Sequence, residues 1–225
     1  MVDRDGERLA AAAAELDSPS VTPFAADVGS EQEVEQVIAA VVADRGRIDA
    51  AVLNAGIAGA NMPIEDYPVE LFDRVVATNL RGVWLCLRAV VPSMKQARSG
   101  SIVLTSSIQG LSALAGTTAY TTTKHALVGM MKGAALELAE FGVRVNTIHP
   151  GYVETPMMGA IHESVSPEDP AKFQAALAAT VPMRRYAAAD EIARLIRFLV
   201  SDESSYSTGS CFVADGGILA ALPSL

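Results

Sequence analysis

Cysteine, histidine and long apolar runs are all scarce in this chain of 225 residues. The two cysteines, Cys86 and Cys211, have no CxxC partner, and the three histidines are far apart. We therefore predict buried free thiols and no metal site. No continuous apolar run approaches the roughly 20 residues that a membrane-spanning helix needs, and charged residues at positions 3, 4 and 5 rule out a secretory signal there. These absences predict a cytoplasmic protein with no membrane partner.

Positive charge is also in deficit. The chain has 17 Lys and Arg against 26 Asp and Glu, a formal net charge of −9. This balance argues against nucleic acid as a partner. Half of the residues are hydrophobic and only 19% are charged, which is enough apolar material for a sizeable core. We expect one folded domain over residues 1–225, with no linker and no internal repeat.

Short β-branched runs alternate with longer helical patterns along the chain. This alternation predicts a parallel sheet with helices on both faces, in which ligands bind beyond the carboxyl ends of the strands. The predicted strands are 21–25, 50–53, 101–105, 143–148 and 211–213, and the predicted helices are 5–16, 31–45, 69–98, 119–140 and 188–200.

Polar residues follow four of the predicted strands. Asp27 follows the first, Asn54-Ala55-Gly56 the second, Ser107 the third and Pro150-Gly151 the fourth. Because the carboxyl ends of parallel strands meet at one edge, these residues are expected to converge on a single rim.

A proline-rich segment follows the fourth of these strands. Residues 153–182 include prolines at 156, 167, 170 and 182. We expect a mobile loop here, with one short helix near 171–179, placed where a substrate lid would lie.

The strongest chemical pattern is a tyrosine with a lysine four residues later. A phenol has a free pKa of about 10 and is a poor base near neutral pH. Lys124 lies one helical turn from Tyr120, so its charge would favour the phenolate. The hydroxyl of Ser107, thirteen residues before Tyr120, could hold a carbonyl or alcohol oxygen. With Asn79 further upstream, these residues predict a proton-transfer site.

Each of these features has an ordinary structural explanation when it is taken alone. A YxxxK pattern occurs by chance in helices, and Asn79 could be a plain polar helix residue. Asn54-Ala55-Gly56 could be a simple turn, and Asp27 could cap the helix that begins near Glu31. Their joint order and their placement at strand ends favour the functional interpretation.

Taken together, these residues resemble the short-chain dehydrogenase/reductase family over essentially the whole chain. The resemblance implies a Rossmann-like, doubly wound parallel sheet. Leu53 stands where the family's NNAG motif has its first asparagine. The segments that match the family are Asn54-Ala55-Gly56, Asn79 in TNLRG, Ser107 in IVLTSS, Tyr120-Thr-Thr-Thr-Lys124, Arg144-Val145-Asn146, Pro150-Gly151 through Thr155, and Asp215-Gly216-Gly217.

The resemblance implies an NAD(P)-dependent oxidoreductase that transfers a hydride between nicotinamide and a secondary alcohol or ketone. Tyr120 would be the acid/base. Lys124 would lower the pKa of Tyr120 and bind the nicotinamide ribose. Ser107 would orient the substrate oxygen, and Asn79 would hold a water that links Lys124 to solvent.

The family pattern also implies a preference for NAD over NADP. Asp3 stands where the family places the acid that binds the adenosine ribose, and a carboxylate there would repel a 2′-phosphate. The neighbouring Arg4 could instead accept that phosphate, and Asp3 could merely cap a helix. The cofactor-binding residues implied by the family are Asp3, Asp27, Val28, Asn54, Ala55, Gly56, Tyr120, Lys124, Pro150, Gly151 and Thr155.

The substrate and the assembly follow only from family analogy. Leu111, Met157, Met158 and Ile161 would line the pocket, with a polar contact from Gln109. This lining suits a fairly apolar small-molecule alcohol or ketone. A homotetramer is expected first and a dimer second, through the helices at 69–98 and 119–140.

One family motif is missing from the sequence. A strand and a T-G-x-x-x-G-x-G turn should precede Asp3, but only two residues do. Without that strand, the segment 21–25 would be separated from the main sheet unless it pairs beside 50–53. One hypothesis is that the chain is truncated relative to a full-length dehydrogenase. The alternative is a cofactor-poor family member that acts as a binding or assembly subunit without turnover.

Overall fold

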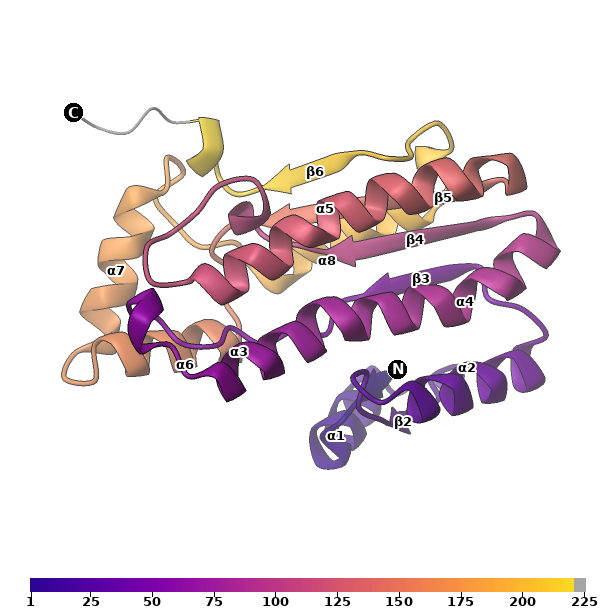
Figure 1. Ribbon diagram of the computed structural model, residues 1–225, viewed down its shortest axis with the longest axis horizontal. Coiled ribbons are helices and arrows are strands. Elements are labelled where there is room, and N and C mark those ends of the chain that lie inside the picture. The colour runs from indigo at the N-terminus through magenta and orange to yellow at the C-terminus, as the bar shows by residue number, and fades with distance from the viewer. Residues whose placement is uncertain (221–225) are drawn as a thin grey trace.

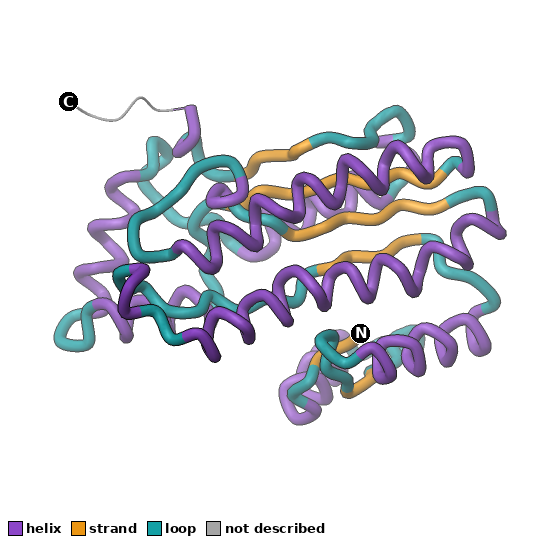
Figure 2. The backbone as a smooth tube through the Cα atoms, viewed as in Figure 1, coloured by secondary structure: helices purple, strands orange, loops and turns teal. Residues whose placement is uncertain are grey.

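The computed structural model describes residues 1–220. A four-stranded parallel sheet runs through the molecule in the order β3-β4-β5-β6, with α4 and α5 on one face and α8 on the other (Figures 1 and 2). The elements are β3 (Ala50–Leu53), β4 (Gly100–Thr105), β5 (Val143–Pro150), β6 (Cys211–Ala214), α4 (Val83–Ala97), α5 (Thr118–Leu138) and α8 (Ala189–Val200). The predicted Rossmann-like parallel sheet is confirmed.

The central strands are apolar on both sides because helices cover both faces. Ile102 and Leu104 of β4 belong to the larger core cluster with Val145 of β5. Val103 and Ile148 belong to a second cluster, which packs against residues of α8. All five side chains are fully buried. This two-sided packing fixes the carboxyl ends of β4 and β5, where the candidate site lies.

One long helical stretch packs beside this sheet. It consists of α3 (Val69–Val76), a π-helical segment (Ala77–Gly82) and α4. By length and by its mean hydropathy of 1.2, the stretch could cross a membrane. Its side chains Val75, Val83 and Met94 are instead buried within the protein, which is the behaviour of a core helix.

The N-terminal strands form a sheet of their own. β1 (Val2–Asp3) pairs in parallel with β2 (Phe24–Ala25), and neither joins the four-stranded sheet. The predicted separation of 21–25 is therefore confirmed, and this segment does not move beside β3. The strand is shorter than predicted because its partner β1 pairs with it through only two residues.

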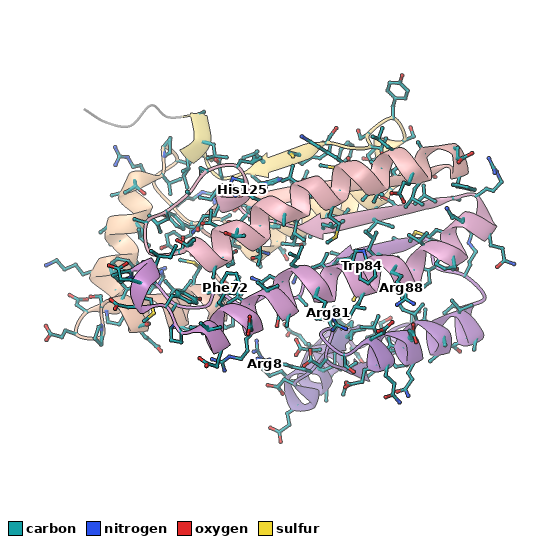
Figure 3. The ribbon with its side chains drawn as sticks, viewed as in Figure 1. Arg8, Phe72, Arg81, Trp84, Arg88 and His125 are labelled. Carbon is teal, nitrogen blue, oxygen red and sulfur yellow. The ribbon has the colours of Figure 1, made fainter. Side chains whose placement is uncertain are left out.

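Two helices complete this N-terminal unit, and two arginines attach it to the rest. The helices are α1 (Gly6–Leu16) and α2 (Glu31–Arg45). Arg88 of α4 pairs with Glu31 of α2, and Arg81 donates a hydrogen bond of 2.5 Å to the carbonyl oxygen of Gly29. Figure 3 labels both arginines, on the side of the long helical stretch that faces the N-terminal unit.

The segment after β5 differs from the prediction. It contains two helices, α6 (Pro156–Val165) and α7 (Pro170–Thr180), where one short helix in a loop was expected. Both prolines occupy the first turn, where a missing N–H costs nothing, so they begin helices and do not mark a loop. Figure 1 shows both helices beyond the carboxyl ends of the strands, where the lid was expected. Its mobility stays a prediction.

Candidate active site

Tyr120 and Lys124 lie one turn apart on α5, as the spacing predicted. The Nζ of Lys124 is 5.4 Å from the centre of the Tyr120 ring. Burial raises the pKa of Tyr120, and a hydrogen bond with Ser107 acts in the opposite direction. The expected lowering of the tyrosine pKa is therefore not seen in this structure, because burial outweighs the opposing effect of Ser107.

Lys124 is an almost completely buried cation. Its side chain is 4% exposed, and burial lowers its pKa to about 8. Nζ donates a hydrogen bond of 2.8 Å to the carbonyl oxygen of Thr105, at the end of β4. Within residues 1–220 this is the only hydrogen bond that Nζ makes, so two of its three N–H groups remain for a ligand.

Ser107 lies two residues beyond the end of β4. Its Oγ accepts a hydrogen bond of 3.1 Å from the backbone N–H of Gln109. This leaves the hydroxyl hydrogen free, and Ser107 lies close enough to Tyr120 to act against the rise in the pKa of the tyrosine. The strand end and the first turn of α5 thus bring Ser107 and Tyr120 together.

Asn79 is fully buried in the π-helical segment. Its Oδ1 accepts a hydrogen bond from the N–H of Ile57, and its Nδ2 donates one to the carbonyl oxygen of Ile57, both at 2.8 Å. Nδ2 also lies 3.4 Å from Oγ1 of Thr123 on α5. π-Helical turns are frequent at functional sites. Asn79 therefore ties the turn after β3 to α5, while its role in holding a water stays a prediction.

The turn after β3 reaches the same place. A Cβ on Gly56 would lie 3.4 Å from Oδ1 of Asn79 and 3.6 Å from Nζ of Lys124. A side chain at Gly56 would therefore fill the space beside these two polar groups. The structure thus gathers Gly56, Asn79, Ser107, Tyr120 and Lys124 at the carboxyl ends of β3 and β4.

A cavity of about 510 Å³ lies between the N-terminal unit and the turn after β3. Arg4 and Asp27 line it on one side and Arg74 on the other. Val28 lies between Asp27 and Gly29, which both line the cavity, and it packs against Gly82, where a Cβ would lie 2.9 Å from its Cγ2. The predicted residues Asp27 and Val28 therefore border this cavity or lie next to it.

Neither Asp3 nor Asp27 is a helix N-cap, which was the ordinary explanation for each. Asp5 caps α1 and Ser30 caps α2. The carboxylate of Asp3 accepts from the N–H of Asp5 at 2.9 Å, and that of Asp27 accepts from the N–H of Gly29 at 2.8 Å. Both form short local turns, and one oxygen of each carboxylate stays available.

The remaining predicted residues lie at the end of β5. Pro150 is its last residue. The N–H of Gly151 donates to the carbonyl oxygen of Ala214 at 3.0 Å, and a Cβ on Gly151 would lie 2.8 Å from Cα of Asp215. Thr155 caps α6 by accepting from the N–H of Met158. They share the rim with the site, on the side of α6.

Sequence reasoning missed two groups that hold the site together. The carbonyl oxygen of Thr105 binds Lys124, and the buried ring of His149 binds the carbonyl oxygen of Ser107. A strand end carries no motif for a carbonyl contact. His149 had one usable signal, because it directly precedes the Pro150-Gly151 pair at the predicted rim.

Three features could contact a nicotinamide nucleotide. They are the buried ammonium of Lys124 with its free N–H groups, the open space at Gly56, and the neighbouring cavity. These features fit the ribose and adenosine parts of such a cofactor. The region of the pyrophosphate is less complete. Within residues 1–220 neither β1 nor β2 pairs with β3, and no Gly-rich turn precedes Asp3. Among the same residues, no cluster of three or more metal-ligating side chains occurs.

The residues predicted to line the substrate pocket are partly exposed in the structure. Leu111 and Met157 are about 40% exposed, while Met158 and Ile161 are half-buried. Oε1 of Gln109 accepts hydrogen bonds from the hydroxyls of two threonines on the same side, Thr117 at 2.7 Å and Thr121 at 2.9 Å.

Known proteins match this chain over nearly its whole length. A family model described as Enoyl-(Acyl carrier protein) reductase matches residues 1–219. The chain is 37% identical to levodione reductase from Leifsonia aquatica, over 98% of this chain and 84% of that protein. It is 40% identical to a 3-alpha-(or 20-beta)-hydroxysteroid dehydrogenase from Mycobacterium tuberculosis, over 99% of this chain and 78% of that protein.

Solved structures give the same result. The crystal structure of levodione reductase matches with a TM-score of 0.95, over 98% of this chain and 87% of that one. NAD+-bound xylitol dehydrogenase matches with a TM-score of 0.88 at 34% identity, over 96% of this chain and 87% of that one. With the Tyr120–Lys124 pair at the carboxyl ends of a parallel sheet, these matches show that the chain belongs to the short-chain dehydrogenase/reductase family of nicotinamide-dependent oxidoreductases.

Proposed function

We propose that this chain transfers a hydride between NAD and a secondary alcohol or ketone, with Tyr120 as the acid/base. The observation that carries the proposal is the buried Lys124, one turn from Tyr120 and next to Gly56 and Asn79. The nicotinamide ring of the cofactor supplies the hydride acceptor or donor. The protein supplies the position of the substrate and the path of the proton.

Each of the four polar residues of the site then has a separate role. In the oxidation direction, Oη of Tyr120 takes the proton of the substrate hydroxyl. Ser107 holds the substrate oxygen by a hydrogen bond and stabilises its developing charge. Lys124 favours the phenolate of Tyr120 by its positive charge, and its free N–H groups bind the cofactor ribose. Asn79 holds the turn after β3 and a water between Lys124 and solvent.

The preference for NAD rests on Asp3, whose carboxylate would repel a 2′-phosphate. Arg4 borders the cavity and works against this preference. The relatives include both types, since xylitol dehydrogenase is described with NAD+ bound and ElxO with NADP bound. A competition titration of NAD against NADP tests this part, and tighter binding of NADP would overturn it.

An apolar secondary alcohol or ketone is the proposed substrate class. Leu111 and Met157, which family analogy places at the pocket, offer exposed apolar surface. Two relatives are named for a dione and a hydroxysteroid, which supports the same class.

We also propose a cytoplasmic homotetramer, with a dimer as the second choice. Phe72 and Trp84 on the long helical stretch, labelled in Figure 3, and Leu136 on α5 are large apolar side chains exposed by at least 40%. Light scattering at micromolar concentration tests the assembly, and a monomer there would overturn it.

A second candidate is a binding or assembly subunit without turnover. It is favoured by the outer edges of β1 and β3, which have no strand partner among residues 1–220. Calorimetric titration with NAD separates the two. Binding weaker than millimolar would favour the assembly role, whereas tighter binding would favour the enzyme.

The direct test is turnover of a panel of secondary alcohols with NAD, with the Tyr120→Phe variant as the control. We expect this variant to lose turnover by roughly 10²- to 10⁴-fold and to keep its NAD affinity. Equal turnover by both proteins would show that Tyr120 is not the acid/base.

A further inference from the structure

A buried histidine on β5 contacts the backbone of Ser107. His149 is fully buried, and its Nδ1 lies 2.7 Å from the carbonyl oxygen of Ser107. Its other ring nitrogen, Nε2, lies 2.8 Å from Oγ1 of Thr147, two residues earlier on the same strand. Thr147 is also fully buried. Both ring nitrogens therefore have a partner, and neither partner is water.

These two contacts fix the tautomer of the ring. A carbonyl oxygen can only accept a hydrogen bond, so Nδ1 of His149 must carry the hydrogen. In the neutral ring, Nε2 then has a lone pair and accepts from the hydroxyl of Thr147. Burial lowers the pKa of His149 and outweighs the bond to Ser107, which acts to raise it, while the charges of Lys124 and His125 act in the same direction as burial. The result is a hydrogen-bond chain in which Thr147 donates to His149 and His149 donates to Ser107.

The His149 ring continues the hydrogen bonding between β4 and β5 beyond the point where the backbone of β5 has a donor. The N–H of Ser106 donates to the carbonyl oxygen of Ile148 at 2.9 Å. Pro150, the next candidate donor on β5, has no N–H. The imidazole of His149 supplies a donor at this point, one residue further along the segment that leaves β4.

Ser107 is thereby held from two sides. Its carbonyl oxygen also accepts from the N–H of Gly110 at 2.9 Å, within the turn that follows. Ser106 is anchored too, because its Oγ donates to the carbonyl oxygen of Lys124 on α5 at 3.0 Å. The bond from His149 ties the Ser107 peptide to β5, and the bond from Ser106 ties the same segment to the helix that carries Tyr120.

We infer that His149 is a positioning residue for Ser107, which holds the serine hydroxyl opposite Tyr120 by fixing the Ser107 carbonyl. The inference rests on the role proposed above for Ser107. A change of orientation of the Ser107–Ile108 peptide would move Oγ away from the substrate oxygen. Displacements of about 1 Å in such sites can cost roughly 10²-fold in rate.

The hydrogen-bond chain is tested first without cofactor or substrate. Nitrogen-15 NMR of the chain labelled at histidine reports which ring nitrogen carries the hydrogen. We expect His149 to be protonated at Nδ1 and to stay neutral well below the ordinary histidine pKa of about 6.5. A ring protonated at Nε2 would overturn the inference, whatever the activity of the protein.

Variants at His149 test whether this hydrogen-bond chain acts through Ser107. His149→Leu removes the donor and fills the volume, and we expect kcat to fall roughly 10- to 100-fold with little change in KM. His149→Asn places an amide donor near the position of Nδ1 and should recover most of kcat. If Asn and Leu are equally impaired although both melt like the wild type, the bond to Ser107 does not matter.

A double-mutant cycle separates this inference from the proposed function. Ser107→Ala lowers kcat if Ser107 acts as proposed, and adding His149→Leu should then cost nothing more. Losses that multiply would show that His149 acts independently of Ser107 and would overturn the inference. A Ser107→Ala variant with full turnover would instead refute the role of Ser107, while the tautomer measurement would still judge the hydrogen-bond chain.

Thr147→Val serves if His149→Leu does not fold. Valine has the shape of threonine and lacks only the hydroxyl that donates to Nε2. We expect the tautomer population to move toward Nε2–H and kcat to fall by less than in His149→Leu. An unchanged tautomer and an unchanged kcat would refute the hydrogen-bond chain from Thr147 through His149 to Ser107.

Discussion

The Nζ of Lys124 on α5 donates a hydrogen bond of 2.8 Å to the carbonyl oxygen of Thr105 at the end of β4. This bond joins the helix that carries the candidate acid/base to the central strand of the sheet. It also places a nearly buried cation against a single neutral acceptor. The lysine is therefore held in position at a cost to its charged form.

This arrangement predicts that stability rises with pH in the alkaline range. The pKa of Lys124 falls from 10.5 to about 8 on folding. Between these values the unfolded chain binds a proton that the folded chain has lost, so the free energy of unfolding increases with pH. We expect a gain of about 2 kcal/mol between pH 7.5 and 9.5 from this residue. Urea unfolding at a series of pH values measures it.

The Lys124→Met variant is the control for that experiment. Other groups titrate in this range, and burial raises the pKa of Cys86 to about 11, which works in the opposite direction. Subtracting the free energy of unfolding of the variant from that of the wild type at each pH removes these contributions. A difference between the two proteins that does not change with pH would contradict the predicted shift of Lys124.

Two threonines with buried hydroxyl groups should respond in opposite ways to replacement by valine. Oγ1 of Thr105 is buried and has no hydrogen-bond partner among residues 1–220, whereas Oγ1 of Thr147 bonds to His149. Thr105→Val should leave stability unchanged or raise it, by up to about 1 kcal/mol. Thr147→Val should lower it by about 1–3 kcal/mol, because the histidine nitrogen loses its donor. Equal losses in thermal unfolding would refute the contrast.

Glycine-to-alanine changes at two positions make a second matched pair. A Cβ on Gly110 would lie 2.9 Å from the carbonyl oxygen of Lys124, whereas one on Gly159 in α6 would meet no atom within 4 Å. Gly110→Ala should therefore destabilise the protein by about 1–3 kcal/mol. Gly159→Ala should stabilise it by about 0.5–1 kcal/mol, as expected in a helix interior. Chemical denaturation of both variants decides the matter.

Hydrogen exchange should separate the N-terminal unit from the main sheet. β1 and β2 have only two residues each, while β4 is buried along most of its length. We expect amides of residues 1–47 to exchange faster than those of β4 and β5. Arg88→Met removes the pair with Glu31 and should accelerate only the N-terminal exchange. Uniform protection across both sheets would contradict the division.

The sequence predicted the site better than it predicted the lid. Tyr120 and Lys124 follow from helical spacing, and Ser107 follows from its place after a strand, since both are local features. The contact of His149 with Ser107 depends on the register between β4 and β5, which no local pattern specifies. The helix α6 was missed because a proline such as Pro156 is common both in loops and in the first turn of a helix. Only the cap at Thr155 distinguishes a helix start from a loop.

The division of the strands into two sheets has a consequence for biosynthesis. The N-terminal unit leaves the ribosome before the strands of the four-stranded sheet, yet two strands of two residues cannot persist alone. The unit is held through Arg81 and Arg88 of the long helical stretch, and that stretch packs on strands whose pairings join residues as distant as Gly100 and Val143. Such distant pairings form slowly. The N-terminal unit is thus made before the four-stranded sheet but takes its final structure after it, so its folding depends on residues that are synthesised later.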